Sequence, residues 1–112
     1  MSIIKTIPSH RVVNGEIVNT SEVVVVTNED LYTTNAEECI IVRGTKQTTI
    51  QLHSPTTDHV VVKALTSCII LPDLGKIDEE YDEIGCEKGA CIEFRFCNNN
   101  WYILSSDGLK QS

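Results

Sequence analysis

Short runs of apolar residues separated by polar turn residues dominate the chain and predict β-strands along its length. The clearest alternation covers residues 90–97, where Ile92, Phe94 and Phe96 share one face of a strand. Further strand-like runs occupy residues 39–43, 48–52, 59–65, 68–71 and 101–105. Turn residues recur at roughly 8–12-residue intervals, and no segment of about ten residues has a helical period. The pattern therefore predicts an all-β protein.

Strands at this spacing are typical of a compact antiparallel β-sandwich or barrel-like module, which we predict for residues 39–112. Residues 1–38 are predicted to form an N-terminal β-hairpin or arm for docking or oligomerisation. Asn14-Gly15 lies between two strand-like segments, and Asn-Gly favours the type I′ turn of a hairpin. No internal repeat and no low-complexity tract is apparent.

The longest aliphatic run is Val23-Val24-Val25-Val26. It is apolar on both faces of a strand, so both faces must be covered, either by the chain's own domain or by a neighbouring subunit. The run is far too short to cross a bilayer. We therefore predict that these four residues form a subunit interface.

Composition agrees with the strand pattern. Of 112 residues, 35 are Val, Ile or Thr, whereas Ala and Leu together number 10. Branching at Cβ disfavours helix and suits a pleated sheet, so a helical bundle is excluded. The length is that of a single domain.

The net charge of −7 disfavours binding to nucleic acid and to anionic membranes. We expect no partner of either kind. Residues 1–25 contain no signal-peptide pattern, so we expect synthesis in the cytoplasm. Seven of the sixteen acidic residues fall in 73–87, which we predict to be an exposed loop. Whether this loop binds a cation is left open.

The chain has five cysteines, and an odd number cannot pair completely within one chain. Without a secretion signal, free thiols are expected. The spacing of Cys86, Cys91 and Cys97 differs from that of a zinc knuckle, so no metal site is predicted. A disulfide between Cys86 and Cys91 and a cytosolic metal or thiol protein remain alternatives.

No residue pattern points to catalysis. His10, His53 and His59 lie outside any nucleophile elbow, and the clustered acids do not form a separated carboxylate pair. His53 and His59 flank a turn and are interpreted as surface polar residues. We therefore predict no catalytic residue, no cofactor and no enzymatic activity.

The only tryptophan follows a polar Asn98-Asn99-Asn100 turn and precedes Tyr102. Trp101 is either an anchor in the core beneath the last strands or an exposed platform for a ligand. On the second interpretation, Asn99, Asn100, Trp101 and Tyr102 form a ligand or partner contact. A receptor- or glycan-binding fibre tip is the corresponding alternative function.

The order of strands and loops over residues 39–108 resembles small β-rich modules of phage and large-virus structural proteins. The segments that carry the resemblance are 40–44, 48–52, 60–64, Gly75-Lys76-Ile77-Asp78 and the final pair 90–96 and 100–104. The most distinctive part is Asn100-Trp101-Tyr102 followed by Ser105-Ser106-Asp107-Gly108.

Modules of this kind serve as capsid decoration proteins or as neck and tail-fibre segments. The resemblance implies a non-enzymatic virion protein that coats or stabilises the particle. It also implies a homotrimer that contacts the major capsid protein or other virion proteins. Such a protein is made in the host cytoplasm and incorporated into the virion.

Overall fold

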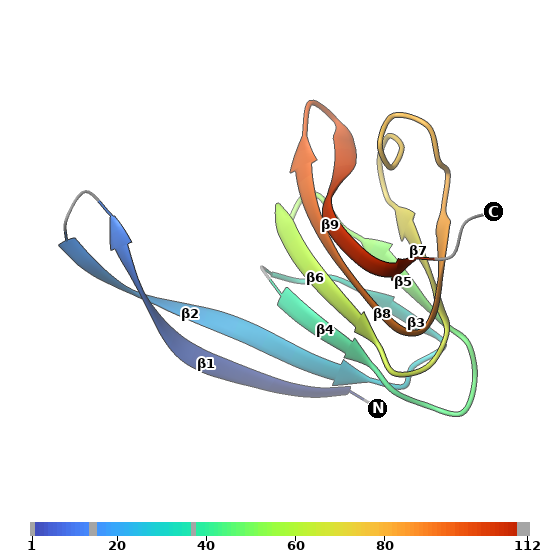
Figure 1. Cartoon of the computed structure of the whole chain (residues 1–112), viewed down its shortest axis with the longest axis horizontal. Helices are drawn as coiled ribbons and strands as arrows, with labels where there is room; N and C mark the ends of the chain where they lie inside the picture. Colours follow the sequence, from blue (N-terminus) through green and yellow to red (C-terminus); the bar gives the residue numbers. More distant parts are fainter. Residues whose placement is uncertain (1, 14–15, 37, 110–112) are drawn as a thin grey trace.

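The computed structural model describes residues 2–13, 16–36 and 38–109, and the described chain is all-β with no helix (Figure 1). The predicted fold class is therefore confirmed at this level. The strands are β1 (Ser2–Val13), β2 (Glu16–Thr27), β3 (Leu31–Thr33), β4 (Glu38–Val42), β5 (Thr48–Leu52), β6 (His59–Ala64), β7 (Cys68–Pro72), β8 (Ile84–Cys97) and β9 (Asn100–Leu109).

These strands form one mixed sheet in the order β1-β2-β4-β6-β8-β7-β5-β3, with β9 paired to β8. The long strand β8 joins two branches: its residues 91–95 pair with β6, and its residues 84–86 pair with β7. The sheet curls about this shared strand into a half-barrel (Figure 1). A sandwich of two separate sheets is not confirmed, because β8 keeps the two branches continuous.

The predicted module was antiparallel, whereas the observed sheet is mixed. Four strand pairs are parallel: β2 with β4, β4 with β6, β3 with β5, and β5 with β7. The reason is that the chain crosses from one branch to the other after each strand from β2 to β6. Next-but-one strands thus become neighbours and run in the same direction. We call residues 23–72, which contain all four parallel strand pairs, the parallel-strand region, and we call residues 73–109 the cap.

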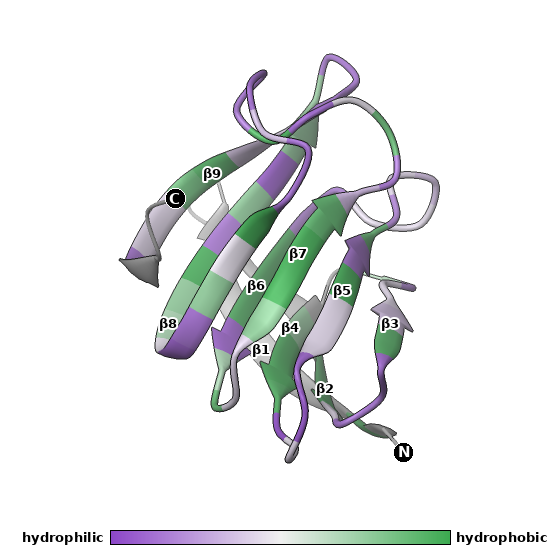
Figure 2. Cartoon of the chain, turned by 90° about the vertical axis from the view of Figure 1, so that its right-hand side faces the viewer, coloured by the Kyte–Doolittle hydropathy of each residue, from purple (hydrophilic) through white to green (hydrophobic). Residues whose placement is uncertain are grey.

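The core lies between the two branches, which face one another in Figures 1 and 2. β5 and β6 alternate residue by residue between buried and half-buried positions, so one face of each strand points inward. The register stacks the inward residues in two ladders. One ladder contains Val25, Ile40, Val62 and Ile92, and the other contains Tyr32, Ile50, Ile70 and Ile84. All eight side chains are buried.

β1 pairs with β2 in an antiparallel register that runs from Ser2 opposite Thr27 to Val13 opposite Glu16. The predicted Asn14-Gly15 turn lies outside the described residues, and the N-terminal hairpin stays a prediction. The division at residues 38 and 39 also stays a prediction. Val25 and Tyr32, which precede it, belong to the same core as the later strands.

Candidate functional site

Apolar side chains gather on the outer face of the branch formed by β2, β4 and β6. The register pairs Ile3 with Val26 and Val26 with Ile41, and it pairs Val24 with Cys39 and Cys39 with Val61. Paired residues point to the same face of a sheet. We call this set the outer strip: Ile3, Val24, Val26, Cys39, Ile41 and Val61. The Ile3 side chain is 60% exposed, and the other five are half-buried.

The valine run predicted as an interface is thereby divided between two faces. Val25 is fully buried in the core, and Val23 packs against the core from the same side. Val24 and Val26 point outward on the outer strip. The chain's own domain therefore covers one face of the run. Contact of the other face with a neighbouring subunit stays a prediction.

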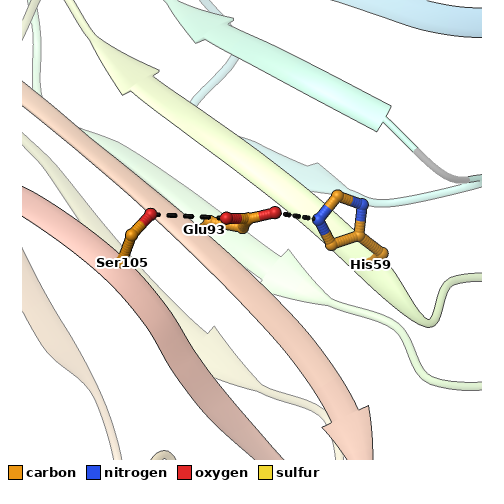
Figure 3. A network of polar contacts seen from close by, with 3 residues as sticks. All are labelled: His59, Glu93 and Ser105. Atoms are coloured by element: carbon orange, nitrogen blue, oxygen red, sulfur yellow. Dashed lines mark hydrogen bonds and ion pairs between the residues drawn. The ribbon is translucent and has the colours of Figure 1, made fainter.

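A polar network borders the outer strip where β6, β8 and β9 meet (Figure 3). His59 Nε2 lies 2.5 Å from Glu93 Oε2, and the Ser105 hydroxyl donates to Glu93 Oε1 at 3.3 Å. Glu93 is the direct cross-strand partner of Val61, which places the network beside the strip. The His59 and Glu93 side chains are 33% and 34% exposed. The hydrogen bond from His59 holds the pKa of Glu93 below its ordinary value, against a smaller opposing effect of burial.

The order of groups in this network does not match that of a nucleophile with its base. In a catalytic triad the imidazole lies between the hydroxyl and the carboxylate, so that it accepts the hydroxyl proton. Here the carboxylate of Glu93 lies between Ser105 and His59. The arrangement joins three strands through the carboxylate of Glu93. Sequence reasoning missed it because the pairing of β6 with β8 depends on the fold and not on local pattern.

The acidic loop is anchored to the turn predicted as a ligand contact. Asp78 N–H donates to the Trp101 carbonyl at 2.8 Å, and Trp101 N–H donates to the Lys76 carbonyl at 3.0 Å. Asp78 Oδ1 also accepts from Ile103 N–H at 2.9 Å. The predicted exposure is correct for the acidic side chains of residues 78–83, but Ile77 in the same loop is fully buried. Residues 84–87 of the predicted loop belong instead to β8, and Ile84 and Cys86 there are buried.

Trp101 is fully buried and packs against Phe96, with ring centroids 5.3 Å apart at 54°. The structure therefore agrees with the first interpretation of Trp101, an anchor in the core. Asn100 Oδ1 accepts a hydrogen bond from Lys76 N–H, so the Asn100 side chain holds the acidic loop against the turn. Asn99 is exposed and Tyr102 is half-buried. A ligand contact at this turn stays a prediction, and these two side chains are the ones able to provide it from the surface.

The five cysteines are free thiols in different environments. Cys68 and Cys86 are buried side by side, whereas Cys91 is half-buried and Cys97 is exposed. Within the described part of the chain, no three His, Cys, Asp or Glu side chains gather as metal ligands. The zinc alternative built on Cys86, Cys91 and Cys97 therefore has no geometric support. The described residues also contain no helix that is long and apolar enough to span a membrane.

Comparisons with protein-family models, curated proteins and solved structures find no match to this chain. The resemblance to virion modules consequently rests on the sequence segments described above. It enters below as a proposal.

Proposed function

We propose that this chain is a non-catalytic structural subunit of a virion, associated with the capsid as a decoration protein. Synthesis takes place in the host cytoplasm, and the subunit is then incorporated into the particle. The resemblance of residues 39–108 to β-rich virion modules supports this proposal. The structural observation that carries it is the outer strip.

An aliphatic strip on the outer face of a sheet favours association with another protein surface. Exposed apolar patches on folded proteins mark interaction sites more often than chance. Five of the six residues of the outer strip lie on β2, β4 and β6, which also contribute to the core, so this part of the strip is held in a fixed shape. The net charge of −7 keeps the rest of the surface hydrated and limits non-specific contact.

We propose that the outer strip joins copies of this chain into a homotrimer. The trimer then contacts the major capsid protein or other virion proteins through its remaining surface. Burial of Ile3, Val26 and Ile41 removes apolar area from water, which is the main favourable term in most protein association. The long strand β1 also leaves one edge of the sheet available for main-chain pairing with a partner.

The native mass in solution, measured by light scattering with and without reductant, tests the assembly. The wild-type chain should have three times its mass of 12.5 kDa, independent of reductant. Ile41→Thr should shift the mass toward the monomer because it places a hydroxyl in the interface. Ile69→Thr is the matched control, since Ile69 is half-buried on the outer face of the other branch. A wild-type monomer at high concentration contradicts self-association.

The virion assignment has a separate test. Peptide mass spectrometry of purified particles from cells that express the chain should recover it in a fixed ratio to the major capsid protein. Loss of the chain from particles after a density gradient contradicts incorporation. A trimer that is absent from particles would keep the outer strip as an interface and remove the virion assignment.

A further inference from the structure

Cys68 and Cys86 are the two most deeply buried cysteines, and they come from strands that lie side by side. Their residues are 0% and 3% exposed. Cys68 begins β7, and Cys86 is its direct partner across the antiparallel pairing with β8. Direct partners in such a ladder have Cα atoms about 4.5–5.5 Å apart. That separation lies within the range of roughly 4.4–6.8 Å found for disulfides.

The two thiols also contact one another. A hydrogen bond joins the side chains of Cys68 and Cys86. This bond lowers the pKa of Cys68, against the opposing effect of burial, and together with burial it raises the pKa of Cys86. Cys68 is therefore the thiol that ionises first, while Cys86 keeps its proton and donates it to the neighbouring sulfur.

A metal is the other common use of adjacent thiols, and it needs more ligands than this pair provides. A structural zinc site takes four ligands, most often Cys and His. Among the described residues, no third side chain of the usual ligand types joins Cys68 and Cys86. The pair therefore stands as an isolated dithiol within the core.

We propose that Cys68 and Cys86 form a disulfide site that is oxidised by a small-molecule disulfide of the glutathione type. The Cys68 thiolate attacks one sulfur of oxidised glutathione, the S–S bond of that molecule breaks, and one glutathione thiolate leaves. Cys86 then loses its proton and attacks the Cys68 sulfur, which releases the second glutathione thiolate. One protein disulfide has formed, and the two glutathione thiolates have taken up the two protons.

Access to the buried pair comes from local opening between β7 and β8. These strands share three residue pairs, between residues 68–70 and 84–86. The next residues of β8, Glu87, Lys88 and Gly89, are exposed. A short ladder beside an exposed segment opens at lower cost than the core strands around it. The inference is independent of the proposed virion function.

The disulfide would close a loop that contains the whole acidic segment between β7 and β8. Closing a loop of this length restricts the unfolded chain, so the oxidised protein should be the more stable form. The disulfide would also join the parallel-strand region to the cap covalently. Oxidation would thus fix the position of the loop that packs on Trp101.

The test uses the full-length chain in glutathione buffers of graded oxidising strength, quenched with acid and alkylated. Trypsin places each of the five cysteines on a different peptide, with Cys68 in 64–76 and Cys86 in 77–88. We expect a linked pair of these two peptides in the oxidised protein. The unfolding temperature should rise by roughly 10 °C on oxidation and return on reduction.

Two variants make the result specific. The triple variant C39A/C91A/C97A keeps only the buried pair and should form the same link with the same rise in unfolding temperature. Cys86→Ala should form no internal link and should show no rise. The proposal is overturned if Cys68 and Cys86 both remain alkylatable after oxidation of the triple variant. A linkage of either residue to Cys91 in the wild-type chain overturns it as well.

Discussion

The parallel-strand region and the cap share one core but are built from different kinds of residue. In the parallel-strand region, the neighbouring strands β2, β4 and β6 place Val25, Ile40 and Val62 in register, so aliphatic residues meet aliphatic residues. In the cap, the backbone itself takes special conformations. Every described residue with a left-handed φ lies there: Gly75, Asp78, Glu79, Gly89, Asn98 and Asn99.

The difference indicates how each region specifies its structure. A ladder of β-branched residues tolerates exchange between similar side chains, because its stability depends on volume and burial. A cap held by left-handed residues and single hydrogen bonds depends on the identity of each residue. Substitutions of similar size should therefore lower the free energy of unfolding more in the cap than in the parallel-strand region.

The largest effect is expected at Trp101. Trp101→Ala should lower the free energy of unfolding by about 3–5 kcal/mol, because it empties the space of a fully buried indole. Ile40→Val in the parallel-strand region should cost only about 0.5–1.5 kcal/mol. Denaturant titration of both variants measures the contrast. A cost for Trp101→Ala of less than about 1 kcal/mol would contradict the buried position of the ring.

A glycine pair provides the next test. Gly75 has a φ of +71°, and a Cβ there would lie 1.9 Å from the Asn99 carbonyl oxygen. Gly75→Ala should therefore cost about 2 kcal/mol or more. Gly85→Ala is the matched control, since a Cβ at that position meets no atom within 4 Å. Its effect on the unfolding midpoint should be close to zero or slightly stabilising. Equal effects of the two substitutions would show that the loop is not fixed against the turn.

A smaller effect is expected from one carboxylate. Asp78→Ala removes the acceptor for Ile103 N–H and should cost about 1 kcal/mol. Asp78→Asn keeps an oxygen acceptor and a residue that tolerates a positive φ, so it should cost less than the alanine variant. Thermal unfolding of both variants separates the hydrogen bond from the charge. Identical losses would assign the effect to charge instead.

The smallest effect concerns Glu93 in the cap, which is hydrogen-bonded to His59 in the parallel-strand region. Its pKa is lowered from an ordinary value of 4.5 in the folded state. The stabilisation is thus complete above that value and is lost as the pH falls through the lower, folded pKa. Solvent screens this pair, so Glu93→Gln should cost about 0.5 kcal/mol at pH 6.

That cost should shrink as the pH falls below 4.5 and through the lowered, folded pKa, where the wild-type carboxylate becomes protonated. Parallel melting curves of wild type and Glu93→Gln across this pH range provide the measurement. A difference between the two proteins that does not change with pH would assign the effect of the substitution to packing.

The strand positions could be predicted from sequence because they depend on local alternation. The predicted strand over residues 48–52 coincides with β5, and the predicted faces of Ile92 and Phe94 agree with their burial. Strand partners could not be predicted, since apolar alternation is the same in a parallel and an antiparallel neighbour. The buried Ile77 was missed because it lies in a segment, 73–87, that contains seven acidic residues.

The candidate site was only partly accessible to the same reasoning. The apolar character of Val24 and Val26 is visible in the sequence, but the strip also needs Ile41 and Val61 from strands that follow much later. The contact between Cys68 and Cys86 likewise depends on register. Cys91 and Cys97 lie an even number of residues apart on β8, but such a spacing does not indicate a partner on another strand.

The position of β8 has a consequence for synthesis on the ribosome. β6 and β7 each keep one edge unpaired until residues 84–97 have been made, because β8 covers both edges (Figure 1). A nascent chain that ends before this strand presents two open strand edges rich in Val and Ile, which favour intermolecular pairing. A stall that exposes β6 and β7 outside the ribosome while β8 is still enclosed would therefore promote aggregation, whereas release of β8 would allow the half-barrel to close.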